Sequence, residues 1–340
     1  MAAKPARPRR DIRRRRFIET VMEVLYSDDA HVVEFHRSAG DCRRLLYTFT
    51  PFMTKDLRQE GFGVSFATRQ GFDVVAFKCC NDSWYQQLEP DVLRTIAERS
   101  KEYSFVATYG SSMGGFAAIA LSGIPGADMA VAISPQHSID AEFDRRWAAQ
   151  AAAIGSFRYR ISPETAHGDR LVLIYDDRNA LDVAQIDRIR RDTRFTNVRE
   201  VTIPFSGHPA GHYLAQTGQI TPVIGAILRG EEDIVVRRDW SMVRRSAAYL
   251  VSLAQHAMKH ERNGLAVLGF SRAVALVPHN PGFSYHLSLA LHRVGRLREA
   301  IEEARRTVSL APNDAGFLRH LSNLLDQTAS DVENDDQRSA

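Results

Sequence analysis

Two hydrophobic patterns divide the chain. From about residue 30 to residue 229, short apolar runs alternate with longer segments in which apolar residues recur at helical spacing. This alternation predicts an α/β domain, and the continuous apolar runs from Leu45 onward favour a mostly parallel sheet with helices on both faces. The predicted strands are His31–His36, Leu45–Thr50, Val74–Lys78, Phe105–Tyr109, Met129–Ser134, Leu171–Tyr175 and Val198–Pro204. The predicted helices are Ile12–Tyr26, Pro90–Lys101, Met113–Ser122, Asp140–Ala153, Leu181–Asp192 and His212–Leu228.

The C-terminal third repeats itself every 34 residues. The residue pairs at this offset are Leu276 and Leu310, Pro278 and Pro312, Phe283 and Phe317, His286 and His320, and Leu287 and Leu321. This period, with small residues such as Ala290 and Ala304 and a glycine at Gly295, resembles the tetratricopeptide repeat. The resemblance implies an all-α segment of helical hairpins, beginning near Ala247, that leans on the preceding domain because so few repeats make a weak solenoid.

Charge is distributed unevenly along the chain. The net charge is +3, but residues 1–16 carry +7 and residues 326–340 carry −4, which leaves the body neutral. A neutral body argues against a specific nucleic-acid binder. The predicted divisions are a basic arm and N-terminal helix (1–28), the α/β domain (29–230), the helical repeats (240–327) and a disordered acidic tail (328–340). The arm is expected to be solvated, with weak contact to an anionic membrane surface as the alternative.

The sequence favours a cytoplasmic protein without a cofactor. It has three cysteines without metal-binding spacing, no apolar run long enough to cross a membrane, and no apolar segment of a secretory signal. No glycine pattern for a nucleotide is present, and His256 and His260 lack the glutamate of a zinc-protease motif. We therefore expect neither a cofactor nor a metal. The scarcity of lysine among the basic residues indicates GC-rich, bacterial coding.

One motif points to covalent chemistry. The predicted strand Phe105–Tyr109 runs into Gly110-Ser111-Ser112-Met113-Gly114-Gly115, and an alanine-rich helix follows. This is G-x-S-x-G between a strand and a helix, where the sharp turn lifts the serine to the sheet edge and the glycines allow close packing. Ser112 is the predicted nucleophile. The amide of the next residue, Met113, would face the oxyanion that develops during acyl transfer.

With this motif, residues 30–229 resemble the α/β-hydrolase fold family. The resemblance implies a three-layer α/β/α sandwich with a triad in the chain order serine, acid, histidine. His208 follows the last predicted strand in Ser206-Gly207-His208, which is the place of the general base in that family, and His212 is the alternative. The second oxyanion amide would come from the loop after Leu45–Thr50, where the family's His-Gly pair is absent and Thr50 or Phe52 remains.

The acid of the triad is open among several positions. The spacing of the family points to Asn179, which is not an acid. Asp182 serves if the loop after Leu171–Tyr175 is longer, and Asp176 serves if it is tighter. The structural alternatives are a helix N-cap for Asp182 and a hydrogen-bond acceptor at the strand end for Asp176. We select Asp182.

The resemblance implies a serine hydrolase that acts as an esterase, a deacylase or an acyl transferase through an acyl-enzyme at Ser112. Together with the segment Ser134–Asp140 and the repeats, the motif resembles hydrolase-like proteins of bacterial polysaccharide and glycosylation systems. This implies an acylated small molecule or glycan as substrate and a protein partner for the repeats. The alternative function is a scaffold whose α/β domain kept only its fold, which Asn179 and the missing His-Gly pair favour.

Overall fold

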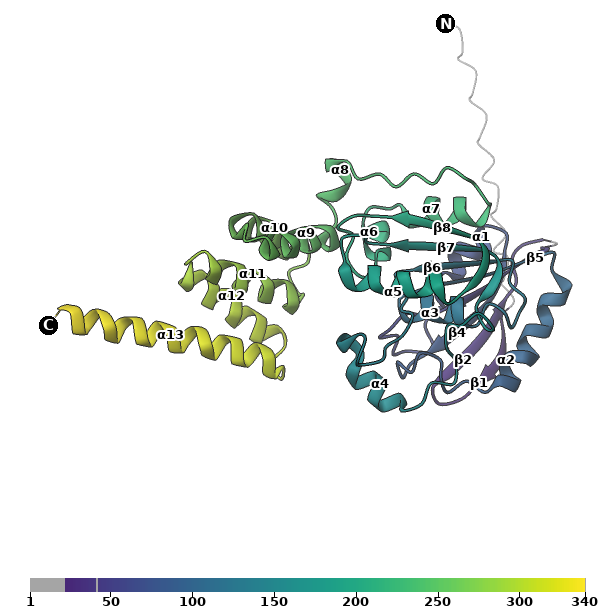
Figure 1. Cartoon of the computed structure of the whole chain (residues 1–340), viewed down its shortest axis with the longest axis horizontal. Coiled ribbons are helices and arrows are strands. Elements are labelled where there is room, and N and C mark those ends of the chain that lie inside the picture. The colour runs from purple at the N-terminus through teal and green to yellow at the C-terminus, as the bar shows by residue number, and fades with distance from the viewer. Residues whose placement is uncertain (1–21, 41, 340) are drawn as a thin grey trace, which may run out of the picture.

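The computed structural model describes residues 22–40 and 42–339, which form an eight-stranded sheet flanked by helices and a row of paired helices (Figure 1). The strands are β1 (Met22–Ser27), β2 (His31–His36), β3 (Arg44–Phe49), β4 (Asp73–Cys79), β5 (Phe105–Ser111), β6 (Met129–Ile133), β7 (His167–Tyr175) and β8 (Arg194–Thr202). The helices of the first part are α1 (Val64–Arg69), α2 (Pro90–Ala97), α3 (Met113–Ala120), α4 (Ala148–Ile154), α5 (Ala180–Arg191), α6 (Gly211–Gln216) and α7 (Ile220–Leu228). After α8 (Trp240–Val243), the repeats are α9 (Ala247–Lys259), α10 (Asn263–Leu276), α11 (Pro281–Arg293), α12 (Leu297–Leu310) and α13 (Ala315–Ser339).

The sheet has the strand order β1-β2-β4-β3-β5-β6-β7-β8. The β1–β2 and β2–β4 pairs are antiparallel, and every other pair is parallel. The predicted α/β class and mostly parallel sheet are therefore confirmed. Because β5, β6, β7 and β8 run side by side in one direction, the loops that follow them meet at one edge of the sheet.

Two apolar cores bury the two faces of this sheet. On one face, α2, α3 and α5 contribute Leu93, Ile119 and Ile189, each at most 4% exposed. On the other face, α1, α6 and α7 pack through residues such as Leu214 and Ile224, which are fully buried. A fully buried aliphatic side chain stabilises the fold by about 1.5–3 kcal/mol, so both layers are anchored to the strands that carry the sheet-edge loops.

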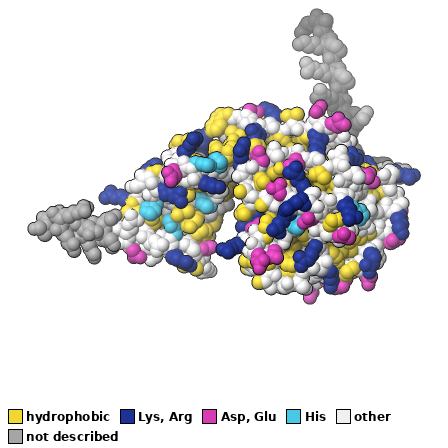
Figure 2. All heavy atoms as spheres, viewed as in Figure 1, with side chains coloured by type: hydrophobic (Ala, Val, Ile, Leu, Met, Phe, Trp, Pro, Cys, Tyr) yellow, Lys and Arg dark blue, Asp and Glu magenta, His cyan; other side chains and the backbone are white. Residues whose placement is uncertain are grey.

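The repeats follow the predicted period of 34 residues. The bounds of α9 recur 34 residues later in α11, and those of α10 recur in α12. Ala290, Ala300 and Ala304 are at most 1% exposed where the helices cross, because only a small side chain fits between them. On the face shown in Figure 2, histidines gather over these helices, and the surface is notched between them and the α/β part.

Several predicted elements were wrong in part. Residues Met22–Tyr26, predicted as the end of a helix, lie in β1, which pairs with β2; the rest of that helix and the basic arm lie outside the described residues. The acidic segment predicted to be disordered continues α13 as far as Ser339. The predicted helix His212–Leu228 is two helices, α6 and α7, because Gly218 between them takes a left-handed backbone (φ 72°). Among the described helices, none combines the length and the apolar character that crossing a membrane requires.

Candidate active site

Ser112 lies in the turn between β5 and α3, with a backbone (φ 53°, ψ −116°) that non-glycine residues rarely adopt. The flanking glycines make this turn possible. A Cβ on Gly110 would stand 2.0 Å from the carbonyl oxygen of Gly114, and a Cβ on Gly114 would stand 2.3 Å from that of Phe49. The G-x-S-x-G pattern thus reflects two backbone contacts that no side chain tolerates, and it fixes Ser112 at the sheet edge.

The structure brings together Ser112, His208 and Asp182, the three predicted triad residues. Ser112 Oγ lies 2.9 Å from His208 Nε2, and His208 Nδ1 lies 2.9 Å and 3.0 Å from the two carboxylate oxygens of Asp182. With Nδ1–H donating to the carboxylate, Nε2 carries the lone pair that accepts the hydroxyl proton of Ser112. Asp182 is 2% exposed and Ser112 is 4% exposed, so both ends of this series are buried, while the His208 side chain between them is 15% exposed.

The acid candidates have separate places. Asn179 is the N-cap of α5, where its side-chain oxygen accepts hydrogen bonds from the amides of Leu181 and Asp182. Asn179, and not Asp182, is therefore the N-cap of α5. Asp182 lies in the first turn of the helix and faces His208. His212, the alternative base, lies on α6; burial, with the charge of His208 as a smaller cause, lowers the pKa of its imidazole.

Asp176 holds the loop that carries His208. Its Oδ1 accepts hydrogen bonds from the amides of Phe205 (2.8 Å) and Arg178 (2.9 Å), and its Oδ2 accepts one from the amide of Gly207 (2.8 Å). The Ser252 hydroxyl, which lies on α9, donates to Oδ2 at 3.2 Å. Asp176 is fully buried, and its contacts fix the backbone before His208 rather than the imidazole itself.

Gln136 contacts both Ser112 and His208, and no sequence pattern predicted these contacts. Its side-chain nitrogen donates to Ser112 Oγ at 2.9 Å and lies 3.2 Å from His208 Nε2. The residue is fully buried in the loop after β6, and its side-chain oxygen has no hydrogen-bond partner in the described part of the chain. Its position at the end of a strand beside the nucleophile strand was the available signal, because such loops converge.

Arg146 makes a second contact with the triad that the sequence did not predict. Its guanidinium bonds to Asp144 and lies 3.3 Å from the Asp182 carboxylate. Burial alone would raise the pKa of Asp144, but its hydrogen bonds with Arg146 and the Arg146 charge lower the pKa below its usual value. Asp144 thus stays ionised and holds Arg146 beside Asp182.

The predicted oxyanion amides border the same site. Of the two amides considered after β3, that of Thr50 donates to the Phe77 carbonyl, whereas that of Phe52 has no acceptor among the described residues. The next amide, that of Met53, donates to Asp82. The amide of Met113 opens α3 and has no acceptor within the helix. The helix N-terminus adds positive potential at this position.

Aromatic side chains form a wall beside His208. The rings of Phe52, Trp84 and Trp147 lie 5.0–5.8 Å apart by their centroids, and Trp147 lies 6.4 Å from the imidazole of His208. The indole nitrogens of Trp84 and Trp147 are buried without a partner among the residues that the structure describes. This apolar wall limits the water that reaches the base.

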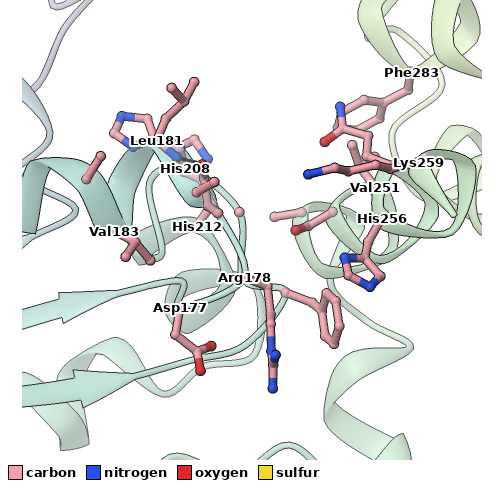
Figure 3. Close-up of a pocket in the computed structure, with 18 of the residues that line it drawn as sticks. Asp177, Arg178, Leu181, Val183, His208, His212, Val251, His256, Lys259 and Phe283 are labelled. Carbon is pink, nitrogen blue, oxygen red and sulfur yellow. Dashed lines mark hydrogen bonds between the residues drawn. The ribbon is translucent and has the colours of Figure 1, made fainter. Parts of the chain in front are cut away.

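A cleft of about 1100 Å³ extends from His208 to the repeats (Figure 3). The loops after β7 and β8 line one side, and α9 and the start of α11 line the other. In the described part of the chain, no group of three or more histidine, cysteine, aspartate or glutamate side chains could hold a metal ion.

Comparisons with known proteins give limited likeness. No family model and no curated protein matches the chain. A capsule O-acetyltransferase of Neisseria meningitidis serogroup A is 13% identical over 58% of this chain and 93% of its own, with a TM-score of 0.40. An esterase of Pyrococcus furiosus is 13% identical over 60% of this chain and 87% of its own, with a TM-score of 0.41. MamA is 20% identical over 26% of this chain, with a TM-score of 0.25, and the match spans about half of MamA.

Proposed function

We propose that the protein is a serine acyl hydrolase or acyl transferase of α/β-hydrolase type. The observation that carries this proposal is the hydrogen-bonded series Ser112–His208–Asp182 at a strained strand-to-helix turn. A nucleophile, a base and a residue that orients the base, in this geometry, form the arrangement that activates a serine hydroxyl for attack on a carbonyl.

The reaction begins when Ser112 Oγ attacks the carbonyl carbon of an ester and its proton passes to His208 Nε2. The negative charge on the former carbonyl oxygen is stabilised by the amides of Met113 and Phe52. The bond from carbon to the leaving oxygen then breaks, and His208 returns the proton to that oxygen, which leaves an acyl group on Ser112. Asp182 keeps the imidazole in the required tautomer and stabilises the imidazolium.

In the second half, water or an alcohol attacks the acyl-enzyme as His208 removes its proton. The Gln136 side-chain nitrogen stands near both Ser112 Oγ and His208 Nε2, on the side where the leaving or incoming oxygen must lie. Attack by water makes the protein an esterase, and attack by a sugar hydroxyl makes it an acyl transferase. The resemblance to polysaccharide-associated proteins favours an acylated glycan as the substrate.

Labelling with a fluorophosphonate probe tests the proposal. We expect the native protein to label, Ser112→Ala to lose the label, and Ser111→Ala, a change at the adjacent buried hydroxyl, to keep it. A folded native protein that does not label would favour the scaffold function. Label that persists in Ser112→Ala would place the nucleophile at another residue.

A further inference from the structure

The cleft beside His208 has walls from both parts of the chain (Figure 3). His208 and His212 lie on the α/β side, and Lys259 and Phe283 lie on α9 and α11. A molecule in this cleft therefore touches the proposed general base and the repeats at the same time. Its volume, about 1100 Å³, lies just above the usual range for small-molecule sites and suits an extended ligand.

Specific contacts hold the two walls together. Ser252 on α9 bonds to Asp176, and Ser246 before α9 donates to Gln216 on α6 at 2.7 Å. The ring of Phe205, three residues before His208, packs edge-on against His256 of α9 at 5.2 Å. The first repeat helix is thus part of the site that holds the base.

Two cations, Arg178 and Lys259, and two carboxylates, Asp177 and Asp187, line the cleft. Arg178 and Lys259 have no ion-pair partner among the described residues, and Figure 3 shows the Lys259 amine directed into the cleft. Of the two lining carboxylates, Asp187 lies 3.5 Å from Arg190, which also pairs with Glu200 at 3.1 Å, and Asp177 has no ion-pair partner in the described part of the chain. Burial, followed by the neighbouring charges of His260 and Arg178, lowers the pKa of His256 and disfavours its charged form.

The remaining lining is mixed. Besides polar and aromatic side chains, it contains six aliphatic residues: Ala180, Leu181, Val183, Ala184, Ala248 and Val251. The side chains of Ser252, Gln255 and Asn280 offer hydroxyl and amide groups, and Phe205 and Phe283 offer ring faces. Hydroxyls and amides pair with the oxygens of a polyol, and aromatic rings pack on its apolar C–H surface.

We propose that the cleft binds the anionic, hydroxyl-rich part of the acyl substrate, with its negative group held by Arg178 and Lys259. The shared chemistry is that of an acidic carbohydrate, whose charge comes from a carboxylate or from a phosphate. The inference rests on the proposed function, because it places this ligand so that its ester reaches His208 and Ser112. The repeats then select the substrate instead of serving only as a surface for a protein.

The test measures binding to Ser112→Ala, which cannot turn the substrate over. The probes are fluorescent oligogalacturonate, a fluorescent glycerol-phosphate oligomer and a neutral malto-oligosaccharide of the same length. We expect at least one anionic probe to bind at least about tenfold more tightly than the neutral one, and added salt to weaken its binding. The double variant Arg178→Glu and Lys259→Glu should weaken this binding by about tenfold or more. The matched control, Arg94→Glu and Lys101→Glu on the surface of α2 and the turn after it, should not.

Each other outcome contradicts a defined step. Equal binding of the neutral and anionic probes, or unchanged binding in the cleft double variant, would overturn the inference. Binding that does not slow fluorophosphonate labelling of Ser112 in the native protein would also overturn it, because the ligand would not reach the site. Intact binding with no labelling of the native protein would overturn the proposed hydrolase and leave an anion-binding cleft.

Discussion

The side-chain nitrogen of Gln136 lies 2.9 Å from Ser112 Oγ. The same nitrogen is 3.2 Å from His208 Nε2, so it borders both ends of the hydrogen bond between Ser112 and His208. Gln136 thus donates a hydrogen bond to the Ser112 oxygen and stands beside the proposed base.

We predict that Gln136→Ala lowers kcat/KM for an aryl ester by about ten- to hundredfold, because a buried hydrogen bond to a reacting oxygen is lost. His137→Ala is the control, since the His137 imidazole lies 2.8 Å from Asp192 and away from Ser112. Steady-state kinetics of both folded variants make the comparison. Equal rates for Gln136→Ala and the native protein would show that this amide has no part in the reaction.

Substitutions of the two aspartates are predicted to have different effects, one on turnover and the other mainly on stability. Asp182→Asn should lower turnover by about 10²–10⁴-fold, because the imidazole loses its orienting carboxylate. Asp176→Asn should lower turnover clearly less but reduce the free energy of unfolding by about 1–3 kcal/mol, because the hydrogen bonds to one oxygen are lost. Kinetics and denaturant unfolding separate the effects. If Asp176→Asn is the slower enzyme while both variants remain folded, our choice of the acid is wrong.

The repeats are predicted to lose stability in acid through His286. Its ring stacks on Phe270 at 5.4 Å, and burial lowers the pKa of the imidazole in the folded state. The imidazole therefore binds a proton more readily in the unfolded chain than in the folded one. The stability that the neutral His286 contributes is fully present above the unfolded pKa of about 6.5, and it is lost as the pH falls below that value.

Thermal melts of the native protein between pH 8 and pH 5 measure this loss. In His286→Gln the side chain no longer titrates, so we expect a smaller decrease in Tm between the two pH values. His279→Gln, at an exposed position before α11, should behave as the native protein does. An equal decrease in all three proteins would assign the acid sensitivity to other groups.

A charge placed in the core of the repeats is predicted to unfold the repeats without unfolding the α/β part. Ala290 is fully buried on α11, so Ala290→Arg places an unpaired charge in the interior and should cost several kcal/mol. We expect limited proteolysis to cut the repeats while Ser112 keeps its fluorophosphonate label. Leu268→Arg, where the native side chain is 67% exposed on α10, is the control and should resist the protease. Loss of label together with the repeats would show that the two parts unfold as one unit.

The strand-to-helix turn and the repeat could be predicted from the sequence because both are local patterns. Gly110 and Gly114 each lie two residues from Ser112 in the sequence, and the 34-residue period is set by the lengths of successive helices and turns. His208 could be predicted in the same way, because it follows a predicted strand at the edge of the sheet where Ser112 lies.

Contacts between segments that are distant in the sequence could not be predicted. Gln136 and Arg146 meet the triad only after β6 and the segment before α4 fold over the sheet edge, and no spacing announces such contacts. β1 was mistaken for a helix because its apolar residues fit either period, and pairing with β2 decides between them. The choice between Asp176 and Asp182 likewise depended on which residue caps α5, and Asn179 does.

One buried carboxylate joins the base to the repeats. Asp176 bonds the backbone at Phe205 and Gly207 and the hydroxyl of Ser252 in α9. Recombination that exchanged these repeats for a set from another protein would bring a helix without that hydroxyl, and the loop of His208 would lose a support. Descendants of this gene are therefore expected to inherit the two halves together, with positions 176 and 252 changing in concert rather than drifting independently.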